Sequence, residues 1–435
     1  MKDATPSPPR IGFVVWPEKG HIYPTMHLAR ILQERGVQIY YFGKEIGRSI
    51  VSEQGWSYEQ LGPEPEMISA LENQSDHEAR ASIELLIANF SRRLREIGIT
   101  ELFVDPLCHQ AAIAALLVGV RVKYVWVFNP PYCRTAYAPF GSSLVLYRNP
   151  VARVAPRLLW APVIIALRYY AVRSRFMKQS LFRVINNLLR EYSARFNRPM
   201  VLTSYGYRLD LPSVVCGPEV LRPCLDSNVS YLGLGVDSRR AEQSVTVAGD
   251  RPLIYCSFGG NFPRYKRALQ TMLHVTATAG QMPDFHFIVQ VPPEFIEKLP
   301  ACHPNLSVLS TVPTLALLKR AKAAVIHGGY GSIKECIYFG VPMVILPFAF
   351  DQPANTALLI RHGAAIGLSP SRANPDRLSA ALRHVIHDSE IGKAIAHLRT
   401  QSLAQADCDL HFSESIAGTV PLIAEDGSAP RQSVV

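Results

Sequence analysis

The sequence predicts an α/β protein made of two doubly wound domains that face each other across a cleft. Short apolar runs alternate with helical segments in both halves of the 435-residue chain, the order typical of parallel sheets with right-handed crossovers. A polar, glycine-containing stretch at residues 236–250 separates the halves and is predicted to be a linker. The length is ample for two cores of ordinary size.

The first domain is predicted to span residues 1–235, with a basic, apolar insertion at about 148–198. Helices are expected where apolar residues recur at helical spacing, and strands where short runs are apolar throughout. The expected strands are residues 11–16, 37–43, 58–61, 101–105, 122–128, 200–204 and 214–217, and the expected helices are residues 25–35, 80–97 and 110–118.

The second domain is predicted to span residues 251–400, followed by a C-terminal helix at 401–423 and a disordered tail at 424–435. The expected strands are residues 252–258, 286–291, 306–310, 323–326 and 343–346, and the expected helices are residues 265–279, 314–322, 375–386 and about 389–423.

Composition narrows the class of protein. Hydrophobic residues make up 48% of the chain, which is typical of a globular protein with large cores. The eight cysteines include no CxxC pair and no zinc pattern, so buried free thiols in a reducing compartment are expected. The start, MKDATPSPPR, lacks the apolar stretch of a signal peptide, and no apolar run approaches the length of a membrane span. A cytoplasmic location is predicted.

The net charge of +10 is concentrated between Arg148 and Arg198, where arginines interleave with apolar residues and Glu191 is the single acid. This pattern is typical of a basic amphipathic helix and suits a peripheral membrane contact, an apolar or acidic acceptor, or a partner protein. The alternative is a helix whose apolar face joins the core and whose arginines are solvated. No recognition motif accompanies the charge, so nucleic acid is not an expected partner.

A strand, a glycine turn and a helix N-terminus follow one another at residues 323–339 and predict an anion site. The strand ends before His327 and Gly329, and the helix is expected to start at Ser332. Free N–H groups and the helix dipole bind anions, and glycines let a phosphate approach the backbone. The N–H groups of Gly331 and Ser332, with the His327 side chain, are expected to bind a diphosphate. For an isolated HGG the alternative is an ordinary turn with a core histidine.

Three polar residues further along are predicted to bind the rest of such a ligand. Glu335 lies one helical turn beyond the anion site, at a reach that suits ribose hydroxyls. Asp351 and Gln352 follow the next strand, at the edge where open α/β sheets bind ligands, and suit a sugar. The stretch therefore predicts a site for a nucleoside-diphosphate sugar.

These residues resemble the donor signature of the family 1 (UDP-glycosyltransferase-like) glycosyltransferases, of the bacterial natural-product, macrolide or carotenoid glucosyltransferase type. The resemblance implies the GT-B fold and a hexosyltransferase whose nucleotide-sugar donor is a co-substrate, with no cofactor. It also implies that the last helix returns to the first domain. The residues that carry it are His327, Gly329, Ser332, Glu335, Gly340, Val341, Pro342, Asp351, Gln352 and Asn355.

The resemblance implies further donor contacts, and the sequence differs from the family pattern at one place. It implies that the turn containing Ser257, Gly259 and Gly260 approaches the donor phosphates, with Arg264 a candidate phosphate contact. Many members carry Trp-x-Pro-Gln or Val-Pro-Gln, whose aromatic ring stacks on the base, where this chain has STVPT at residues 310–314. The backbone of Val312 can still bond the base edge. UDP and dTDP both stay open as the nucleotide.

A second constellation lies in the first domain. His21 is expected on a loop after the first strand, and the spacing of Gly20-His21 and Pro24 resembles the family's acceptor-activation motif. The resemblance implies that His21 is the general base and that Asp105 orients it. A neutral imidazole takes a proton at neutral pH, and a carboxylate on its other nitrogen fixes the tautomer. The alternative for His21 alone is a loop histidine without a role.

The sequence thus predicts an inverting transfer of a hexose, with glucose the expected sugar, to a hydroxyl of an apolar small molecule. No DxD-like metal motif accompanies the donor stretch, so a metal-independent reaction is expected. Candidate acceptor contacts are His109, Trp160 and Phe176. The alternatives are a lipid-acceptor or cell-wall-type GT-B glycosyltransferase, a sugar-nucleotide epimerase, and a non-catalytic protein that binds sugar nucleotides.

Overall fold

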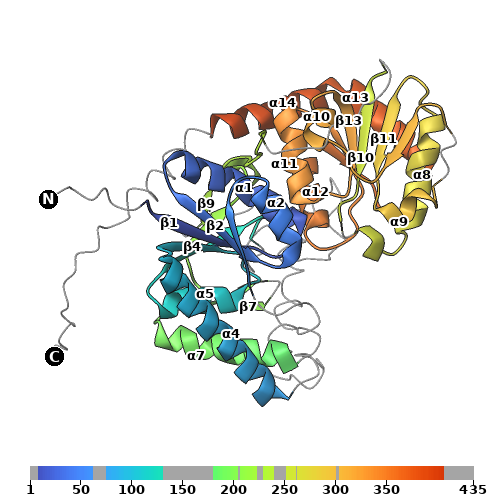
Figure 1. The fold of residues 1–435 in the computed structure, drawn as a ribbon. Helices are drawn as coiled ribbons and strands as arrows, with labels where there is room; N and C mark the ends of the chain where they lie inside the picture. Colours follow the sequence, from blue (N-terminus) through green and yellow to red (C-terminus); the bar gives the residue numbers. More distant parts are fainter. Residues whose placement is uncertain are drawn as a thin grey trace, which may run out of the picture.

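The computed structural model contains two parallel sheets that carry helices on both faces (Figure 1). The order of the first sheet is β3-β2-β1-β4-β5-β8-β9 and that of the second is β12-β11-β10-β13-β14-β15, and every pairing within them is parallel. The predicted class of two doubly wound α/β sheets is therefore confirmed. The structure describes residues 8–61, 75–130, 180–203, 206–222, 229–239, 251–260, 262–299 and 303–405.

The first sheet and its helices come from the N-terminal half. Its strands are β1 (Arg10–Val14), β2 (Gln38–Gly43), β3 (Ser57–Gln60), β4 (Glu101–Val104), β5 (Arg121–Trp126), β8 (Ser213–Val215) and β9 (Val229–Tyr231). A hairpin of β6 (Met200–Thr203) and β7 (Gly206–Leu209) stands apart from this sheet. The helices are α1 (Lys19–Glu34), α2 (Arg48–Ser52), α4 (Asp76–Ile97), α5 (His109–Leu117) and α7 (Ser180–Arg195), with 3₁₀ turns η1 (Glu45–Gly47) and η3 (Glu219–Leu221).

The second sheet and its helices come from the C-terminal half. Its strands are β10 (Leu253–Ser257), β11 (His286–Gln290), β12 (Leu306–Leu309), β13 (Ala321–Ile326), β14 (Met343–Ile345) and β15 (Ala365–Gly367). The helices are α8 (Ala268–Gly280), α9 (Pro293–Ile296), α10 (Thr314–Leu318), α11 (Tyr330–Phe339), α12 (Gln352–Arg361), α13 (Pro375–His387) and α14 (Ser389–Ala404), with the 3₁₀ turn η4 (Phe262–Arg264).

Local chemistry explains why these elements form where they do. All five residues of β10 are buried, as expected for a central parallel strand covered on both faces. Helix α4 begins at a capping box of Ser75 and Glu78 and ends at Gly98, whose φ is 75°. Helix α13 is capped by Asn374, the residue before it, whose side-chain oxygen accepts from the N–H of Arg377.

Several helix boundaries differ from the prediction. Helix α1 begins at Lys19, before Pro24, although a proline usually marks a boundary. The ring removes one backbone hydrogen bond near the start of the helix, and burial of Ile22 and Met26 against the sheet holds the turn. The helix expected at 314–322 ends at Leu318, because its last residues enter β13. Helix α8 begins at Ala268, later than the expected residue 265.

The basic segment at 148–198 lies mostly outside the described residues, as do the acceptor candidates Trp160 and Phe176. Its described part, α7, buries Val184 and Leu188 in the core beside α4. Arg183 pairs with Asp76, and its Nε lies 2.5 Å from Oδ2. In α7 the apolar face therefore joins the core, as the simpler alternative expects, whereas Arg183 is ion-paired. The membrane and acceptor roles of the whole segment stay predictions.

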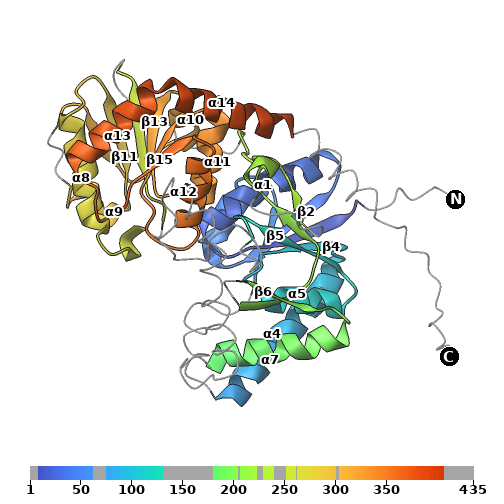
Figure 2. The ribbon, with the colours of Figure 1, turned by 180° about the vertical axis from the view of Figure 1, so that it is seen from behind.

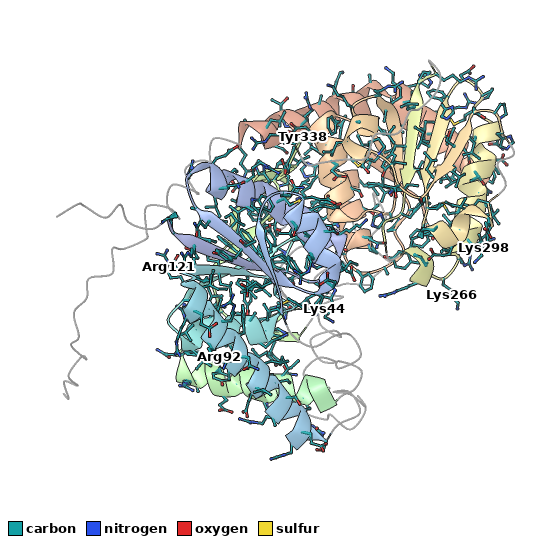
Figure 3. All side chains as sticks on the ribbon, in the orientation of Figure 1. Lys44, Arg92, Arg121, Lys266, Lys298 and Tyr338 are labelled. Carbon is teal, nitrogen blue, oxygen red and sulfur yellow. The ribbon has the colours of Figure 1, made fainter. Side chains whose placement is uncertain are left out.

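The described residues show where several basic side chains and the free cysteines lie. The labelled side chains of Arg92, Arg121, Lys266 and Lys298 lie at the outer edge of both halves (Figure 3). Four cysteines are free and buried, as predicted: Cys108, Cys216, Cys256 and Cys336. In the ranges that the structure describes, no helix is both long and apolar enough to cross a membrane.

The two halves meet through α1, α11 and α14. Helix α11 of the second half lies beside α1 of the first in both views (Figures 1 and 2). At the end of α14, the side chain of Gln405 accepts from the N–H of Glu219 at 2.8 Å and donates to the carbonyl of Tyr231 at 2.9 Å. The chain from residue 406 onward lies outside the description, so the boundaries predicted for the last helix and tail stay predictions.

Candidate functional site

Two adjacent strands of the first sheet bring His21 and Asp105 together. β1 pairs with β4, so their carboxyl ends lie side by side, and the N–H of Asp105 donates to the carbonyl of Val14 at 2.7 Å. The Nδ1 of His21 lies 2.6 Å from Oδ2 of Asp105. The carboxylate is fully buried, whereas the His21 side chain is 16% exposed. One ring nitrogen is thus bound by the carboxylate, and Nε2 is the nitrogen left to meet a ligand.

Backbone donors hold the carboxylate in place. Its Oδ1 accepts from the N–H of Leu107 at 2.9 Å, and the N–H of Trp16 lies 3.4 Å from Oδ2. A buried carboxylate needs such partners, because burying an unpaired charge is costly. The arrangement fixes the orientation of the imidazole and favours a proton on Nδ1.

Electrostatics raise the pKa of His21 above its ordinary value of 6.5. Burial by itself would lower this pKa, but the charge of Asp105 and its hydrogen bond favour the imidazolium, and Glu18 and Asp351 add to them. Asp351 belongs to the second half of the chain. The donor stretch and the imidazole are therefore close enough to interact across the boundary between the two sheets.

One placement differs from the prediction. His21 was expected on a loop, but it lies in the first turn of α1, because that helix starts two residues before it. The first turn still faces the ligand edge of the sheet, since α1 follows β1 directly.

The donor stretch forms the expected strand, turn and helix. β13 ends at Ile326, Gly328 turns the chain with a φ of 86°, and α11 begins at Tyr330 instead of Ser332. The N–H groups of residues 330–332 are therefore those of the first helical turn, which have no partner within the helix. The predicted anion-binding geometry is present at the backbone level.

His327 is packed between two glycines. A Cβ on Gly329 would overlap the His327 ring, and a Cβ on Gly259 would lie 2.9 Å from Nε2. Burial lowers the pKa of His327 to about 4, so the imidazole is neutral at neutral pH. A neutral ring carries one N–H donor. The ring also makes a hydrogen bond to the backbone of Ser257, so its contact with a phosphate stays a prediction.

We expect Gly329→Ala to destabilise the protein by about 1–3 kcal/mol, because the added methyl displaces the buried imidazole. Gly331→Ala is the matched control in the same turn, since a Cβ there meets nothing within 4 Å. Alanine in a helical turn should leave stability unchanged or raise it by up to about 1 kcal/mol. Chemical denaturation measures both, and equal effects of the two variants would contradict the packing account.

Asp351 and Gln352 differ in what they can offer a ligand. The amide oxygen of Gln352 accepts from the N–H groups of Phe348 and Ala349 at 2.8 and 3.1 Å, and its nitrogen donates to the hydroxyl of Tyr265 at 2.8 Å. Asp351 lies at the N-terminal boundary of α12 without a side-chain capping bond, and its Oδ2 accepts from the side-chain nitrogen of Asn355 at 2.7 Å. Burial raises the pKa of Asp351 to about 6. Gln352 therefore shapes the loop, and its contact with a sugar stays a prediction.

The remaining donor candidates lie along the same edge of the second sheet. Ser257 ends β10, and its hydroxyl donates to Oε1 of Gln290 at 3.2 Å. Gly260 follows with open space around its Cα. Glu335 lies on α11, partly exposed, and the buried Val312 precedes α10. The structure thus gathers these residues at one edge, while their individual contacts with a donor stay predictions.

The acceptor candidate His109 lies at the start of a helix, and its imidazole is surrounded by protein. It begins α5, and burial, with the charge of Arg208, lowers its pKa to about 3. Its imidazole is therefore neutral across the physiological range. Its role as an acceptor contact stays a prediction.

Sequence reasoning missed two exposed aromatic side chains that border the site. Trp16 is 38% exposed and lies next to the Asp105 carboxylate through its backbone N–H. Phe350 is 49% exposed, directly precedes Asp351 and has a φ of 56°. Trp16 could have been found from its place at the carboxyl end of the first expected strand, residues 11–16. No local signal reveals Phe350, because bulky residues rarely adopt positive φ.

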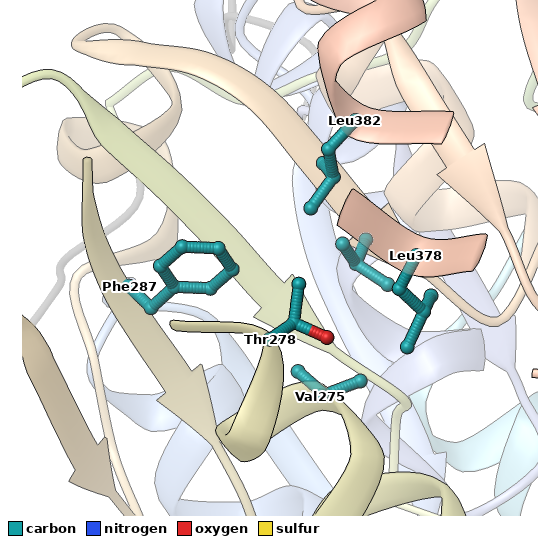
Figure 4. A pocket seen from close by; sticks show the side chains of 6 residues that line it. Val275, Thr278, Phe287, Leu378 and Leu382 are labelled. Carbon is teal, nitrogen blue, oxygen red and sulfur yellow. The ribbon is translucent and has the colours of Figure 1, made fainter. Parts of the chain in front are cut away.

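Among the residues that the structure describes, there is no cluster of metal ligands, and one small gap is defined in the core of the second half. No group of three or more His, Cys, Asp or Glu side chains there could hold a metal ion. A small gap between α8, α13 and the second sheet is lined by Val275, Thr278, Phe287, Val325, Leu378 and Leu382 (Figure 4). Its lining is almost wholly apolar, and it is a packing defect of the core.

Comparison with known proteins points the same way. Residues 274–409 match the family model "Erythromycin biosynthesis protein CIII-like, C-terminal domain". The chain is 22% identical over 182 residues to the NDP-glycosyltransferase YjiC of Bacillus subtilis (strain 168), covering 42% of this chain and 46% of the relative. It is 26% identical over 218 residues to the oleandomycin glycosyltransferase of Streptomyces antibioticus, covering 48% and 49%. The matched part thus spans about half the length of these relatives.

Solved structures match over nearly the whole chain. The crystal structure of the glycotransferase of kitacinnamycin superposes with a TM-score of 0.69 at 22% identity, covering 96% of this chain and all of that one. The glycosyltransferase VinC in complex with dTDP superposes with a TM-score of 0.63 at 17% identity, covering 94% and 99%. These matches confirm the GT-B fold. The family model likens residues 274–409 to an EryCIII-like C-terminal domain, and the relatives and solved structures that this chain resembles are glycosyltransferases.

Proposed function

We propose that this protein transfers a hexose from a nucleoside-diphosphate sugar to a hydroxyl of an apolar small molecule, with inversion at the anomeric carbon. The observation that carries the proposal is the 2.6 Å contact between His21 and Asp105. It lies at the ligand edge of the first sheet, within electrostatic reach of Asp351 from the donor stretch.

His21 acts as the general base in this proposal. Nε2 takes the proton of the acceptor hydroxyl while Nδ1–H donates to the Asp105 carboxylate, which stabilises the imidazolium that forms. The acceptor oxygen forms a bond to the anomeric carbon as the bond from that carbon to the diphosphate breaks. The bonding electron pair leaves on the diphosphate oxygen.

The departing diphosphate is stabilised by the N-terminus of α11. Its first-turn N–H groups and dipole meet the charge that develops on the leaving oxygens, and neutral His327 adds one donor. This electrostatic role belongs to the protein's own groups. Either UDP or dTDP fits the proposal, and the VinC complex supports testing dTDP donors alongside UDP-glucose.

We expect Glu335→Ala to weaken donor binding without changing acceptor binding. In the proposal its carboxylate accepts from the ribose hydroxyls, and loss of a hydrogen bond to a charged group costs about 1.5–3 kcal/mol. Calorimetry with UDP and with dTDP measures the loss. Glu390→Ala is the matched control, because that glutamate is exposed on α14 and pairs with Lys393. Unchanged affinity for both nucleotides would move the ribose contact elsewhere.

Incubation with nucleotide sugars and hydroxylated apolar compounds tests the proposal. UDP- and dTDP-linked hexoses, glucose first, are offered with a panel of acceptors and the products are detected by mass. We expect one acceptor to gain the mass of a hexosyl residue. Epimerised donor without acceptor modification would favour an epimerase, and nucleotide binding without any turnover would favour a binding protein.

A further inference from the structure

The donor helix α11 carries two buried side chains that the proposed chemistry does not use. Tyr330 and Lys334 lie one helical turn apart, so they share a face of the helix. They are 3% and 2% exposed. A lysine is rarely buried to this extent unless its charge is satisfied, which makes this face unusual. The Nζ of Lys334 lies 5.7 Å from the centre of the Tyr330 ring.

Lys334 reaches into the first half of the molecule. Its Nζ donates to the carbonyl of Cys216, directly after β8. A Cβ on Gly235 would lie 3.7 Å from Nζ and 3.7 Å from the carbonyl oxygen of Pro24. Pro24 lies on α1, three residues after His21. The ammonium group is therefore inserted beside the helix that carries the proposed base.

Tyr330 makes the neighbouring contact. A Cβ on Gly217 would overlap the hydroxyl and ring of Tyr330, so only glycine leaves room for the aromatic ring there. The side chain of Lys334 thus contacts Cys216, and that of Tyr330 packs against Gly217. We call Tyr330, Lys334, Cys216 and Gly217 the α11 anchor.

We propose that the α11 anchor holds the donor-binding helix at a fixed position relative to His21, so that Tyr330 and Lys334 are positioning residues for the transfer step. The other face of α11 carries Ser332 and Glu335, which are the donor candidates. One helix thereby binds the donor on one face and the base-bearing domain on the other. Because misplacement of reacting groups by about 1 Å can cost about 10²-fold in rate, such an anchor has a kinetic consequence.

Lys334→Met is the first test, because methionine keeps the length of the side chain and removes the donor. We expect kcat for transfer to fall by about 10- to 100-fold while the Kd for UDP and dTDP stays unchanged. Lys393→Met is the matched control, since Lys393 is exposed on α14. A role limited to stability would lower the unfolding midpoint and leave kcat per folded molecule unchanged, which would overturn the proposal. Equal losses in donor affinity and kcat would also overturn it.

Gly217→Ala tests the anchor from the other domain, without touching α11 itself. The added methyl should displace Tyr330. As for Lys334→Met, we expect kcat to fall while the affinity for UDP and dTDP stays unchanged. Gly392→Ala serves as the control, because a Cβ there meets nothing within 4 Å. An effect of Gly217→Ala on donor affinity alone would contradict the proposal.

The turnover readout rests on the proposed function, so a second readout is independent of it. Hydrogen exchange of Lys334→Met should rise both in α11 and in residues 213–217 of the first half, if the anchor joins them. A rise confined to α11 would overturn the anchor even in an active enzyme. Wild-type protein without transfer activity, but with the joint rise, would reject the proposed function and keep the anchor.

Discussion

His21→Ala should reduce turnover by about 10²–10⁴-fold, the usual contribution of a positioned general base. The imidazole lies against the buried Asp105 with Nε2 left for the acceptor hydroxyl, and no alanine atom can take that proton. The loss should appear in kcat, because in the proposed mechanism the donor binds through the second domain. Steady-state kinetics with the best donor–acceptor pair measure the change, and calorimetry with UDP and dTDP should show unchanged Kd.

His27→Ala is the control for this variant. His27 lies on the same helix, six residues further on, so it reports on any general damage to α1. We expect near-normal kcat for it. Near-normal kcat for His21→Ala would remove His21 from the mechanism, and a loss of donor affinity in that variant would place the side chain at the donor instead.

Asp105→Asn should lower kcat and also move the acid limb of the pH profile to lower pH. Burial lowers the pKa of His21, but the charge of Asp105, its hydrogen bond and the charges of Glu18 and Asp351 together outweigh burial and raise that pKa. The proposed mechanism requires neutral His21, so in the wild type kcat/KM should fall as the pH drops through that raised pKa. Asparagine removes the negative charge but keeps the burial, so the pKa of His21 falls and the limb follows it.

The limb has a second contributor that this comparison separates. Burial raises the pKa of Asp351 to about 6, and this residue is not itself replaced in Asp105→Asn, although the charge of His21 lowers its pKa. If the acid limb of the pH profile stayed in place in Asp105→Asn, the titrating group would be Asp351 or another residue, not His21. If Asp105→Asn changed donor affinity alone, the pairing of His21 and Asp105 would have no catalytic meaning.

Local sequence patterns were sufficient for most of the fold and for the donor edge. Continuous apolar runs predicted β10 and β13, since central parallel strands are buried on both faces. The residues of the donor turn are also close together in the sequence. His327, Gly329 and Glu335 lie within nine residues, so their spacing alone defines the strand, turn and helix that bring them to one edge.

Contacts between distant segments could not be predicted in the same way. His21 and Asp105 are 84 positions apart, and they were paired through the family resemblance together with the expected sheet. Lys334 and Cys216 are 118 positions apart and belong to no motif, so their contact appears only when the two halves are packed together. The start of α1 was missed because tertiary burial outweighed the proline signal.

The central claim is an inverting hexosyl transfer by this chain, and the anomeric configuration of its product tests it most directly. Wild-type protein is incubated with an α-linked UDP- or dTDP-hexose and an apolar hydroxylated acceptor. The new glycosidic linkage is then assigned by proton NMR. The account predicts a β-linked product that His21→Ala forms at a greatly reduced rate. An α-linked product, or a product formed equally fast without the His21 imidazole, would contradict it.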